Sequence, residues 1–402
     1  MAQPTPLRAN TPKGDAGSRL GNTLTLQSRD RKGAVDPKCD STIFFRSPAL
    51  TWTVLSLLVF VLIEASIFRT SWYIKYLEPQ SSAGQVESYL HWLAKPDPTK
   101  VPEVLIVGDS RMAEGFSAPL ADKAVAGKLH FWNFGIGGTT PRVWYYLLRD
   151  ADRSRRRFAA IAIAVDGYAD EDHFDSAPNR LIDLNFAIER LRWTDCWSFA
   201  NSMVSLDYKA KAFSGCMFKG MPLRSDVQAF LLSRNDRIRR SEDWRKNGVA
   251  YLNDYPGRPE SVAGLSADFE HHTLHYPPGL TQAAKDTIEA MVMPSPAEQH
   301  GEMTRYRFLW LGRILDLYKD SPTKIIFFEL ARAPVPKPES WQPATFMQAA
   351  LQRPNVIAMP QNTFRDLERP EIFFDGLHFN KIGRGLFTQR LAEKISTLIG
   401  MQ

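Results

Sequence analysis

The sequence has few cysteines and little excess charge. Three cysteines in 402 residues are too few for a domain built on disulfides. The net charge of +6 is small for this length and the basic residues are scattered, so nucleic acid is not an expected partner. No internal repeat is found. These absences exclude a disulfide scaffold and argue against a nucleic-acid-binding protein and a repeat protein.

The sequence does contain enough apolar residues for a large core. Hydrophobic residues make up 44% and aromatic residues 11%, which excludes wholesale disorder. The length suits one large domain or two ordinary ones. Cys196 and Cys216 can pair if their segment lies outside the cytosol, but two reduced thiols fit the pattern equally well. Cys39 lies in the N-terminal tail, where it has no partner.

The N-terminal part divides into a tail and an apolar segment. Residues 1–46 are rich in Pro, Gly, Ser, Thr and charge, which predicts a disordered cytoplasmic tail. Residues 49–68, ALTWTVLSLLVFVLIEASIF, carry a single charge, Glu64, and no continuous polar stripe. A helix of this length spans the roughly 30 Å of a bilayer core. We therefore expect a transmembrane anchor at 47–70 rather than a buried helix or a cleaved signal peptide.

Flanking charge predicts the orientation of the anchor. The tail carries eight Lys or Arg residues, whereas the segment after the anchor carries only Arg69 and Lys75 nearby. Because positive residues stay inside, the protein is expected to be a single-pass protein of the cytoplasmic (inner) membrane with its N-terminus inside. Residues 71–98, rich in Trp and Tyr, are expected to form a short stalk on the periplasmic or extracytoplasmic side.

Residues 99–402 alternate strand-like and helix-like segments. Short apolar runs indicate strands covered on both faces, at 103–107, 129–134, 158–165, 324–330 and 355–359. This alternation predicts an α/β fold, a three-layer α/β/α domain with a mainly parallel five-stranded sheet. Between about 180 and 310 the rhythm breaks, which indicates a mostly helical insertion.

Three polar segments stand where strands end or the last helix begins. Ser110 follows the first strand in EVLIVGDS, and NFGIGGTT, residues 133–140, follows the second. Late in the chain, FFDGLHFNKIG places Asp375 and His378 three residues apart, just before the final helix. The carboxyl ends of parallel strands meet at one edge of a sheet. A serine nucleophile needs a base, and the base needs an orienting acid, so these residues predict a catalytic triad.

In these motifs the chain resembles an SGNH (GDSL-type) hydrolase, whose domain is flavodoxin-like. The resemblance covers about 102–175 and 323–397 and leaves out the insertion. It implies that Ser110 is the nucleophile, His378 the general base and Asp375 its orienting acid. It also implies an oxyanion hole made by the backbone N–H groups of Ser110 and Gly138, with Gly137 as the alternative donor.

The third motif of the family is altered. Where an Asn usually donates to the oxyanion, this chain has VDGYADEDHFD, with Asp166, Gly167 and Tyr168. Either the Tyr168 hydroxyl replaces that donor, or the two backbone N–H groups act alone.

With its membrane anchor, long insertion and altered third motif, the chain resembles the SGNH partners of membrane-bound O-acyltransferases. That resemblance implies an esterase or O-acetyltransferase that acts on O-acyl groups of a cell-envelope or exported polysaccharide through an acyl-Ser110 intermediate. It needs no cofactor and no metal, and a multi-pass membrane O-acyltransferase is an expected partner. A lipid or small-ester esterase, and a degenerate scaffold that binds polysaccharide in a secretion complex, are the alternatives.

Several charged groups have open assignments. Arg111, directly after Ser110, either binds an anionic or sugar substrate or is ion-paired. The basic run from Arg234 to Lys246 forms either a solvated helix face or a contact with acidic glycan or lipid headgroups. The histidine cluster and an acidic run lack the spacing of metal ligands and are expected to be polar loops, at His271, His272, His275 and residues 170–175.

Overall fold

The computed structural model describes residues 48–70, 72–95, 100–165, 168, 179–268, 270–293, 300–332 and 343–401. The expected tail, residues 1–46, lies outside them. The chain divides into two compact units, residues 1–56 and 57–402. Every contact described below lies within the second unit.

The domain is built on a five-stranded sheet in the order β2-β1-β3-β6-β7, in which every strand pair is parallel. This confirms the predicted fold class and places each strand within a residue or two of its expected position. The strands are β1 (Glu103–Gly108), β2 (His130–Gly135), β3 (Phe158–Val165), β6 (Lys324–Glu329) and β7 (Val356–Ala358).

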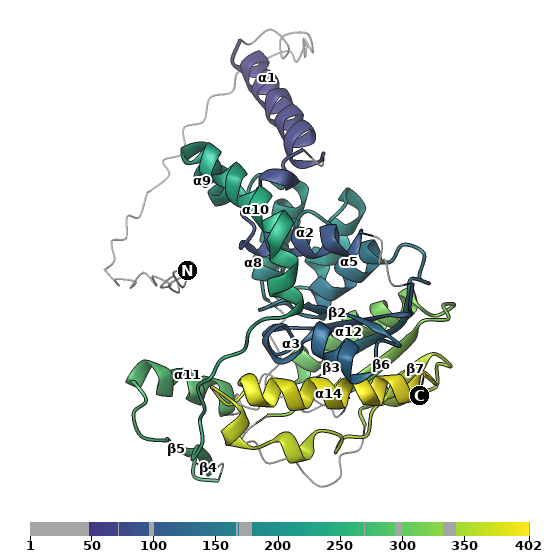
Figure 1. Cartoon of the computed structure of the whole chain (residues 1–402). Coiled ribbons are helices and arrows are strands. Elements are labelled where there is room, and N and C mark those ends of the chain that lie inside the picture. The colour runs from purple at the N-terminus through teal and green to yellow at the C-terminus, as the bar shows by residue number, and fades with distance from the viewer. Residues whose placement is uncertain are drawn as a thin grey trace, which may run out of the picture. The chain divides into compact units, whose positions relative to one another are not determined.

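Helices cover both faces of the sheet, as the expected three layers require (Figure 1). Successive strand residues point to opposite faces, so Val104 and Ile106 join one core while Leu105 and Val107 join the other. The first core is closed by α3 (Ser110–Gly115), α4 (Ala118–Ala124) and α14 (Lys381–Leu398), and the second by α2 (Ser82–Leu93), α5 (Pro141–Ala151), α12 (His300–Leu317) and α13 (Thr345–Ala350).

The insertion is mostly helical, as predicted, and its helices share a third core with residues that precede β1 and with residues of α5 and α12. Cys196 and Cys216 form a disulfide with their Cα atoms 5.4 Å apart, so the two thiols are paired. The bond joins α7 to α8. The elements of the insertion are α6 (Ile182–Ala187), α7 (Cys196–Asn201), α8 (Leu206–Met217), α9 (Arg224–Leu232), α10 (Arg234–Asn253), the hairpin β4 (Ser266–Asp268) and β5 (Thr273–His275), and α11 (Gln282–Val292).

The apolar segment is helical throughout its length. Helix α1 (Pro48–Ile63) continues into a π-helical turn, η2 (Glu64–Phe68). In the described part of the chain, one helix is long and apolar enough to cross a membrane, and it is this one.

The segment expected to be a stalk is part of the domain. Helix α2 packs Val86, Tyr89 and Leu93 into the core beside the sheet, and Tyr73 is 2% exposed. Tyr73, Tyr89 and Trp92 are therefore core residues of the domain rather than parts of a stalk.

A buried ion pair supports the glycine-rich loop after β2. Arg142, on α5, and Asp183, on α6, are both fully buried with Nη1 and Oδ2 3.0 Å apart. The same Oδ2 accepts hydrogen bonds from the hydroxyls of Thr140 and Tyr306, each at 2.9 Å. Asp183 also pairs with Arg180, which donates to the carbonyl of Gly138 at 2.5 Å. One carboxylate thus ties the insertion to this loop.

We predict that Asp183→Ala lowers the free energy of unfolding by about 3–5 kcal/mol, because it leaves the Arg142 charge buried without its partner. Chemical denaturation of the detergent-solubilised chain measures this. The control is Asp207→Ala, which breaks an exposed pair with Lys211 and should cost less than about 1 kcal/mol. Equal, small losses in both variants would show that Asp183 does not hold the loop.

Candidate active site

Ser110 is the first residue of α3, at the carboxyl end of β1. Asp109 caps this helix, since its Oδ1 accepts the N–H of Arg111 at 2.9 Å. Helix α3 lies so close to β2 that a Cβ at Gly135 would be 2.3 Å from the nitrogen of Ala113. Only glycine fits at that position. The close approach places the serine beside the loop that follows β2.

Asn133, on β2, fixes the other end of α3. Its buried side-chain amide donates to the carbonyls of Met112 at 3.1 Å and Phe116 at 3.0 Å. Phe116 is the C-cap residue of α3, and the last carbonyls of a helix lack partners within the helix, so this amide supplies a donor to the carbonyl of Phe116. Its Oδ1 accepts the N–H of Gly135 at 2.9 Å. In the sequence Asn133 is recognised only as the start of the glycine motif. The structure shows that it is a positioning residue for Ser110.

The loop before α14 holds the acid and the base together. Oδ1 of Asp375 accepts the N–H groups of Leu377 at 3.1 Å and His378 at 2.8 Å. The turn between them requires the left-handed backbone of Gly376, at φ 89°. This geometry brings Oδ2 of Asp375 to 2.8 Å from Nδ1 of His378. The backbone alone therefore sets the direction of the carboxylate.

The structure brings the three predicted triad residues together. Nε2 of His378 lies 2.8 Å from Oγ of Ser110, across a sequence separation of 268 residues. The Asp375 contact makes Nδ1 the protonated nitrogen, which leaves Nε2 free to accept the serine proton. His378 is 8% exposed. The arrangement can activate Ser110 as a nucleophile.

The charges around His378 favour its protonated form. Burial lowers the pKa of His378, but the hydrogen bond and charge of Asp375, with smaller contributions from Glu114 and Asp109, outweigh burial and raise it above 6.5. His378 is therefore neutral, and able to accept a proton, only above this raised pKa.

The proposed oxyanion donors lie on the loop beside Ser110. A Cβ at Gly137 would stand 3.6 Å from the Cβ of Ser110. Gly138 follows with φ 75°, and its carbonyl is held by Arg180. The first N–H groups of a helix have no partner within it, which suits the N–H of Ser110, the first residue of α3, to the role of a second donor. The choice between Gly137 and Gly138 stays a prediction.

Tyr168 lies elsewhere than the sequence suggested. Its hydroxyl contacts the carbonyls of Phe327 at 3.0 Å and Met359 at 2.8 Å, and the residue is 3% exposed. Its single proton is therefore used inside the domain, between β6 and β7, and we assign Tyr168 a structural role. Asp166 and Gly167 lie outside the described residues.

Several charged residues near the triad had no role in the sequence prediction. Glu114 lies four residues after Ser110, so the helical spacing directs both side chains to one face. Its Oε2 is buried, 3.8 Å from Nε of Arg258. Arg258 in turn lies over the ring of Phe374, which stacks on His378. Glu114 and Phe374 could have been found from the sequence, because they lie four residues from Ser110 and from His378. Arg258 could not, because it lies far from the triad residues in the sequence.

Arg111 is ion-paired. Its Nη2 lies 2.7 Å from Oδ2 of Asp109, and its Nε also donates to that carboxylate. Burial alone would raise the pKa of Asp109. The charge and hydrogen bonds of Arg111 together have the larger effect, so this pKa falls below its usual range. The buried Arg332, after β6, is coupled electrostatically to both groups. The two sequence neighbours of Ser110 thus form an ion pair beside it.

The histidine cluster forms exposed polar contacts of its own. His271 is exposed and pairs with Asp268 at 2.7 Å, and His272 and His275 are exposed as well. Within the described residues no group of three or more His, Cys, Asp or Glu side chains is arranged to hold a metal ion. The acidic run at 170–175 lies outside the described residues.

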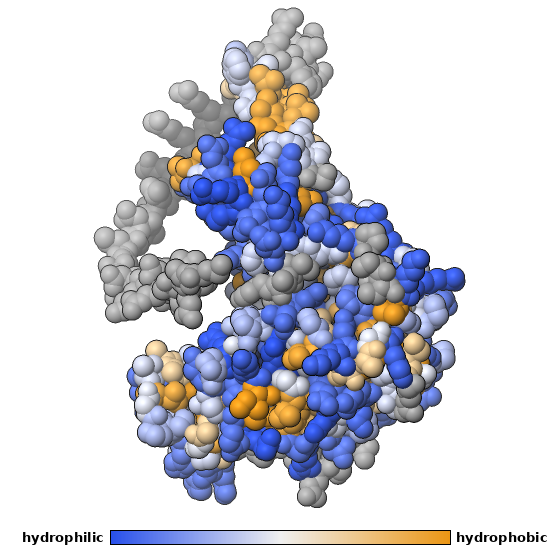
Figure 2. All heavy atoms as spheres, in the orientation of Figure 1, coloured by the Kyte–Doolittle hydropathy of each residue, from blue (hydrophilic) through white to orange (hydrophobic). Residues whose placement is uncertain are grey.

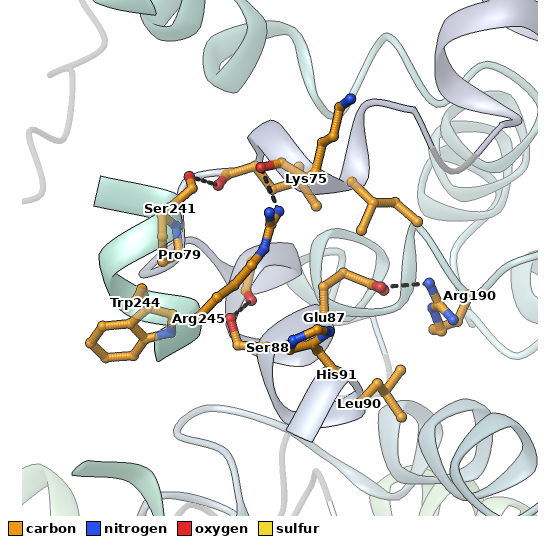
Figure 3. Close-up of a pocket in the computed structure, with 13 residues that line it drawn as sticks. Lys75, Pro79, Glu87, Ser88, Leu90, His91, Arg190, Ser241, Trp244 and Arg245 are labelled. Atoms are coloured by element: carbon orange, nitrogen blue, oxygen red, sulfur yellow. Dashed lines mark hydrogen bonds and ion pairs between the residues drawn. The ribbon is translucent and has the colours of Figure 1, made fainter. Parts of the chain in front are cut away.

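A cavity of about 430 Å³ lies away from the triad, between α2 and α10 (Figure 3). Its lining includes Glu87, Arg190 and Arg245, and Glu87 is held by Arg190 at 2.5 Å. No triad residue lines it. The Ser110 site is instead defined by its hydrogen bonds.

No model of a known protein family matches the sequence, and no curated protein matches it. The activity is therefore inferred from the geometry of the site.

We predict that Glu114→Gln lowers the pKa of His378, because it removes a negative charge that stabilises the imidazolium. An NMR titration of the histidine-labelled chain measures this pKa. Glu393→Gln, which changes an exposed carboxylate on α14, is the control and should leave it unchanged. An unchanged or higher pKa in Glu114→Gln would contradict the electrostatic account.

Proposed function

We propose that the protein is an SGNH-type serine esterase or O-acetyltransferase, anchored in the membrane and acting on O-acyl groups of a polysaccharide outside it. The observation that carries this proposal is the continuous hydrogen-bonded chain from Ser110 through His378 to Asp375. Such a chain is what nucleophilic acyl transfer requires.

The first half of the reaction forms an acyl-enzyme. Oγ of Ser110 attacks the ester carbonyl carbon while Nε2 of His378 takes the hydroxyl proton. The N–H groups of Ser110 and of Gly138 or Gly137 stabilise the oxyanion of the tetrahedral intermediate. The intermediate collapses when His378 passes the proton to the leaving oxygen and the C–O bond breaks. Asp375 remains ionised and stabilises the imidazolium.

The second half reverses these roles. Water, or a sugar hydroxyl, gives its proton to Nε2 of His378 and attacks the acyl carbon. Oγ of Ser110 then leaves and recovers the proton. With water the product is a free acid, and with a sugar hydroxyl it is a new ester. The same residues therefore serve hydrolysis and transfer.

The surroundings of the site support a polar substrate. Arg111 and Asp109 lie beside Ser110. Glu114 acts electrostatically on His378, and Arg258 lies over the ring of Phe374, which stacks on His378. Such groups suit the hydroxyls of a glycan better than a long acyl chain. The charge asymmetry around α1 and the Cys196–Cys216 disulfide both favour an exported domain. A multi-pass membrane O-acyltransferase would supply acyl groups to it.

We expect Ser110→Ala and His378→Ala each to lower kcat/KM for a fluorogenic acetyl ester by about 1,000-fold or more, because triad residues act as a unit. Asp375→Asn should retain more activity than either. Ser225→Ala, which changes an exposed serine on α9, is the matched control and should leave kcat/KM unchanged. The measurement uses the purified full-length chain in detergent.

A wild-type rate no higher than that of Ser110→Ala would exclude the esterase and favour the scaffold that binds polysaccharide without turnover. Transfer is distinguished from hydrolysis by adding a soluble oligosaccharide acceptor. An acylated sugar, found by mass spectrometry, indicates transfer.

A further inference from the structure

We propose that helices α7–α9 of the insertion rest on the phospholipid bilayer beside α1, and so form a second, peripheral membrane contact. This inference rests on α1 spanning the membrane and is independent of the reaction at Ser110.

Large apolar side chains are exposed on this part of the insertion. Single exposed apolar residues are ordinary, but a group of them on neighbouring elements marks an interaction surface. Figure 2 shows apolar side chains at the outer end of α9. We call this group the anchor-proximal surface: Trp193 (48% exposed), Trp197 (68%), Leu206 (82%), Met221 (57%), Leu231 (73%) and Leu232 (81%).

The anchor-proximal surface and the neighbouring Phe218 contact the end of the anchor directly. The ring of Phe218 lies 5.4 Å from that of Phe60, inside the apolar segment. A cavity of about 310 Å³ between α1 and α9 is lined by Phe60, Ile63 and Met221, among others. The guanidinium of Arg69 lies 4.1 Å from the ring of Trp193. If Phe60 and Ile63 are in lipid, these residues lie at the depth of the adjoining headgroups.

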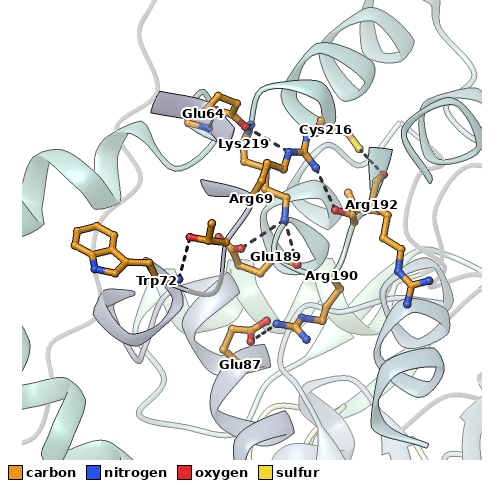
Figure 4. A network of polar contacts seen from close by, with 12 residues as sticks. Glu64, Arg69, Trp72, Glu87, Glu189, Arg190, Arg192, Cys216 and Lys219 are labelled. Atoms are coloured by element: carbon orange, nitrogen blue, oxygen red, sulfur yellow. Dashed lines mark hydrogen bonds and ion pairs between the residues drawn. The ribbon is translucent and has the colours of Figure 1, made fainter. Parts of the chain in front are cut away.

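Polar contacts fix the anchor to the insertion (Figure 4). The Glu64 carboxylate accepts the N–H groups of Lys219 at 2.6 Å and Gly220 at 3.1 Å. Arg69 donates to the carbonyl of Met217 at 2.8 Å. The contacts satisfy the one charge in the apolar segment. They also hold α8 and α9 at a set depth, because the end of the helix cannot swing away from them.

The charges next to the exposed leucines suit a lipid surface. Arg224 begins α9 and Arg234 begins α10, on either side of Leu231 and Leu232, and both are exposed. Arg239 and Arg240 follow on α10, 80% and 50% exposed, and pair with Asp236 and Glu78. Apolar side chains between arginines are the pattern of segments that lie in the bilayer interface. This gives the basic run a role as a contact with anionic headgroups, whereas a glycan would leave the leucines without a partner.

The test places a fluorescent reporter at Leu232 in the full-length chain, with one chain per lipid nanodisc. Cys39→Ser removes the unpaired cysteine, Leu232→Cys receives an NBD label, and the discs contain phosphatidylcholine and phosphatidylglycerol. Nitroxide-labelled lipids quench a label that lies in the bilayer. Interfacial segments enter the bilayer by only about 5–10 Å. We therefore expect the label at 232 to have blue-shifted emission, and a nitroxide at shallow depth to quench most of that emission while a deep nitroxide quenches less.

Two reference positions make the result decisive. Leu57→Cys, seven residues or about 10 Å before Glu64 along the helix, should be quenched more by the deep nitroxide. Ile382→Cys is a matched control because it is 65% exposed and begins α14, which lies at the opposite end of the domain from α9 (Figure 1). It should not be quenched.

Each outcome decides the proposal. Quenching at 57 but not at 232 would overturn it, whether the 232 label is in water or, with blue-shifted emission, covered by protein. No quenching at 57 would remove the anchor and the proposal with it. The headgroup contact is tested with the double variant Arg239→Glu, Arg240→Glu. It is supported if this variant weakens the quenching at 232 in discs with phosphatidylglycerol but not in discs of phosphatidylcholine alone. None of these outcomes depends on acyl transfer.

Discussion

The hydrogen bond between Oγ of Ser110 and Nε2 of His378 is the contact on which the functional account depends. It joins a residue near the start of the α/β domain to one near its end. A parallel sheet makes this possible, since each strand delivers its following loop to the same edge. β1 ends next to Ser110, and the loop before α14 returns to that edge with His378. The sheet order therefore closes the site, although the insertion separates its two halves in the sequence.

The site is held by backbone and buried side chains more than by surface contacts. Asn133 fixes the carboxyl end of α3, and Gly376 lets Asp375 accept two N–H groups. Asp183 ties the insertion to the loop after β2 through Thr140 and Arg180. These supports restrict the rotamers of the reacting groups, which is what preorganised acyl transfer needs. The insertion thus contributes to the site without supplying a triad residue.

The fold class and the meeting of Ser110, His378 and Asp375 were predictable because each motif is a local signal in the sequence. Both-face burial makes parallel strands short apolar runs, and Asp375 and His378 share one turn. Other features depend on directions that the sequence does not encode. Tyr168 lies soon after β3 in the sequence, but this position does not reveal that its hydroxyl points to carbonyls of the core. Spacing left the pairing of Cys196 and Cys216 undecided, because only the fold of α7 and α8 sets their distance.

The most direct test of the central claim is a covalent one. A fluorophosphonate probe reacts with a serine only where a base activates it, and peptide mass spectrometry locates the adduct. We expect a single adduct on Ser110 of the full-length chain, formed much more slowly in His378→Ala. An unmodified Ser110, or labelling that does not change when His378 is removed, would contradict the account.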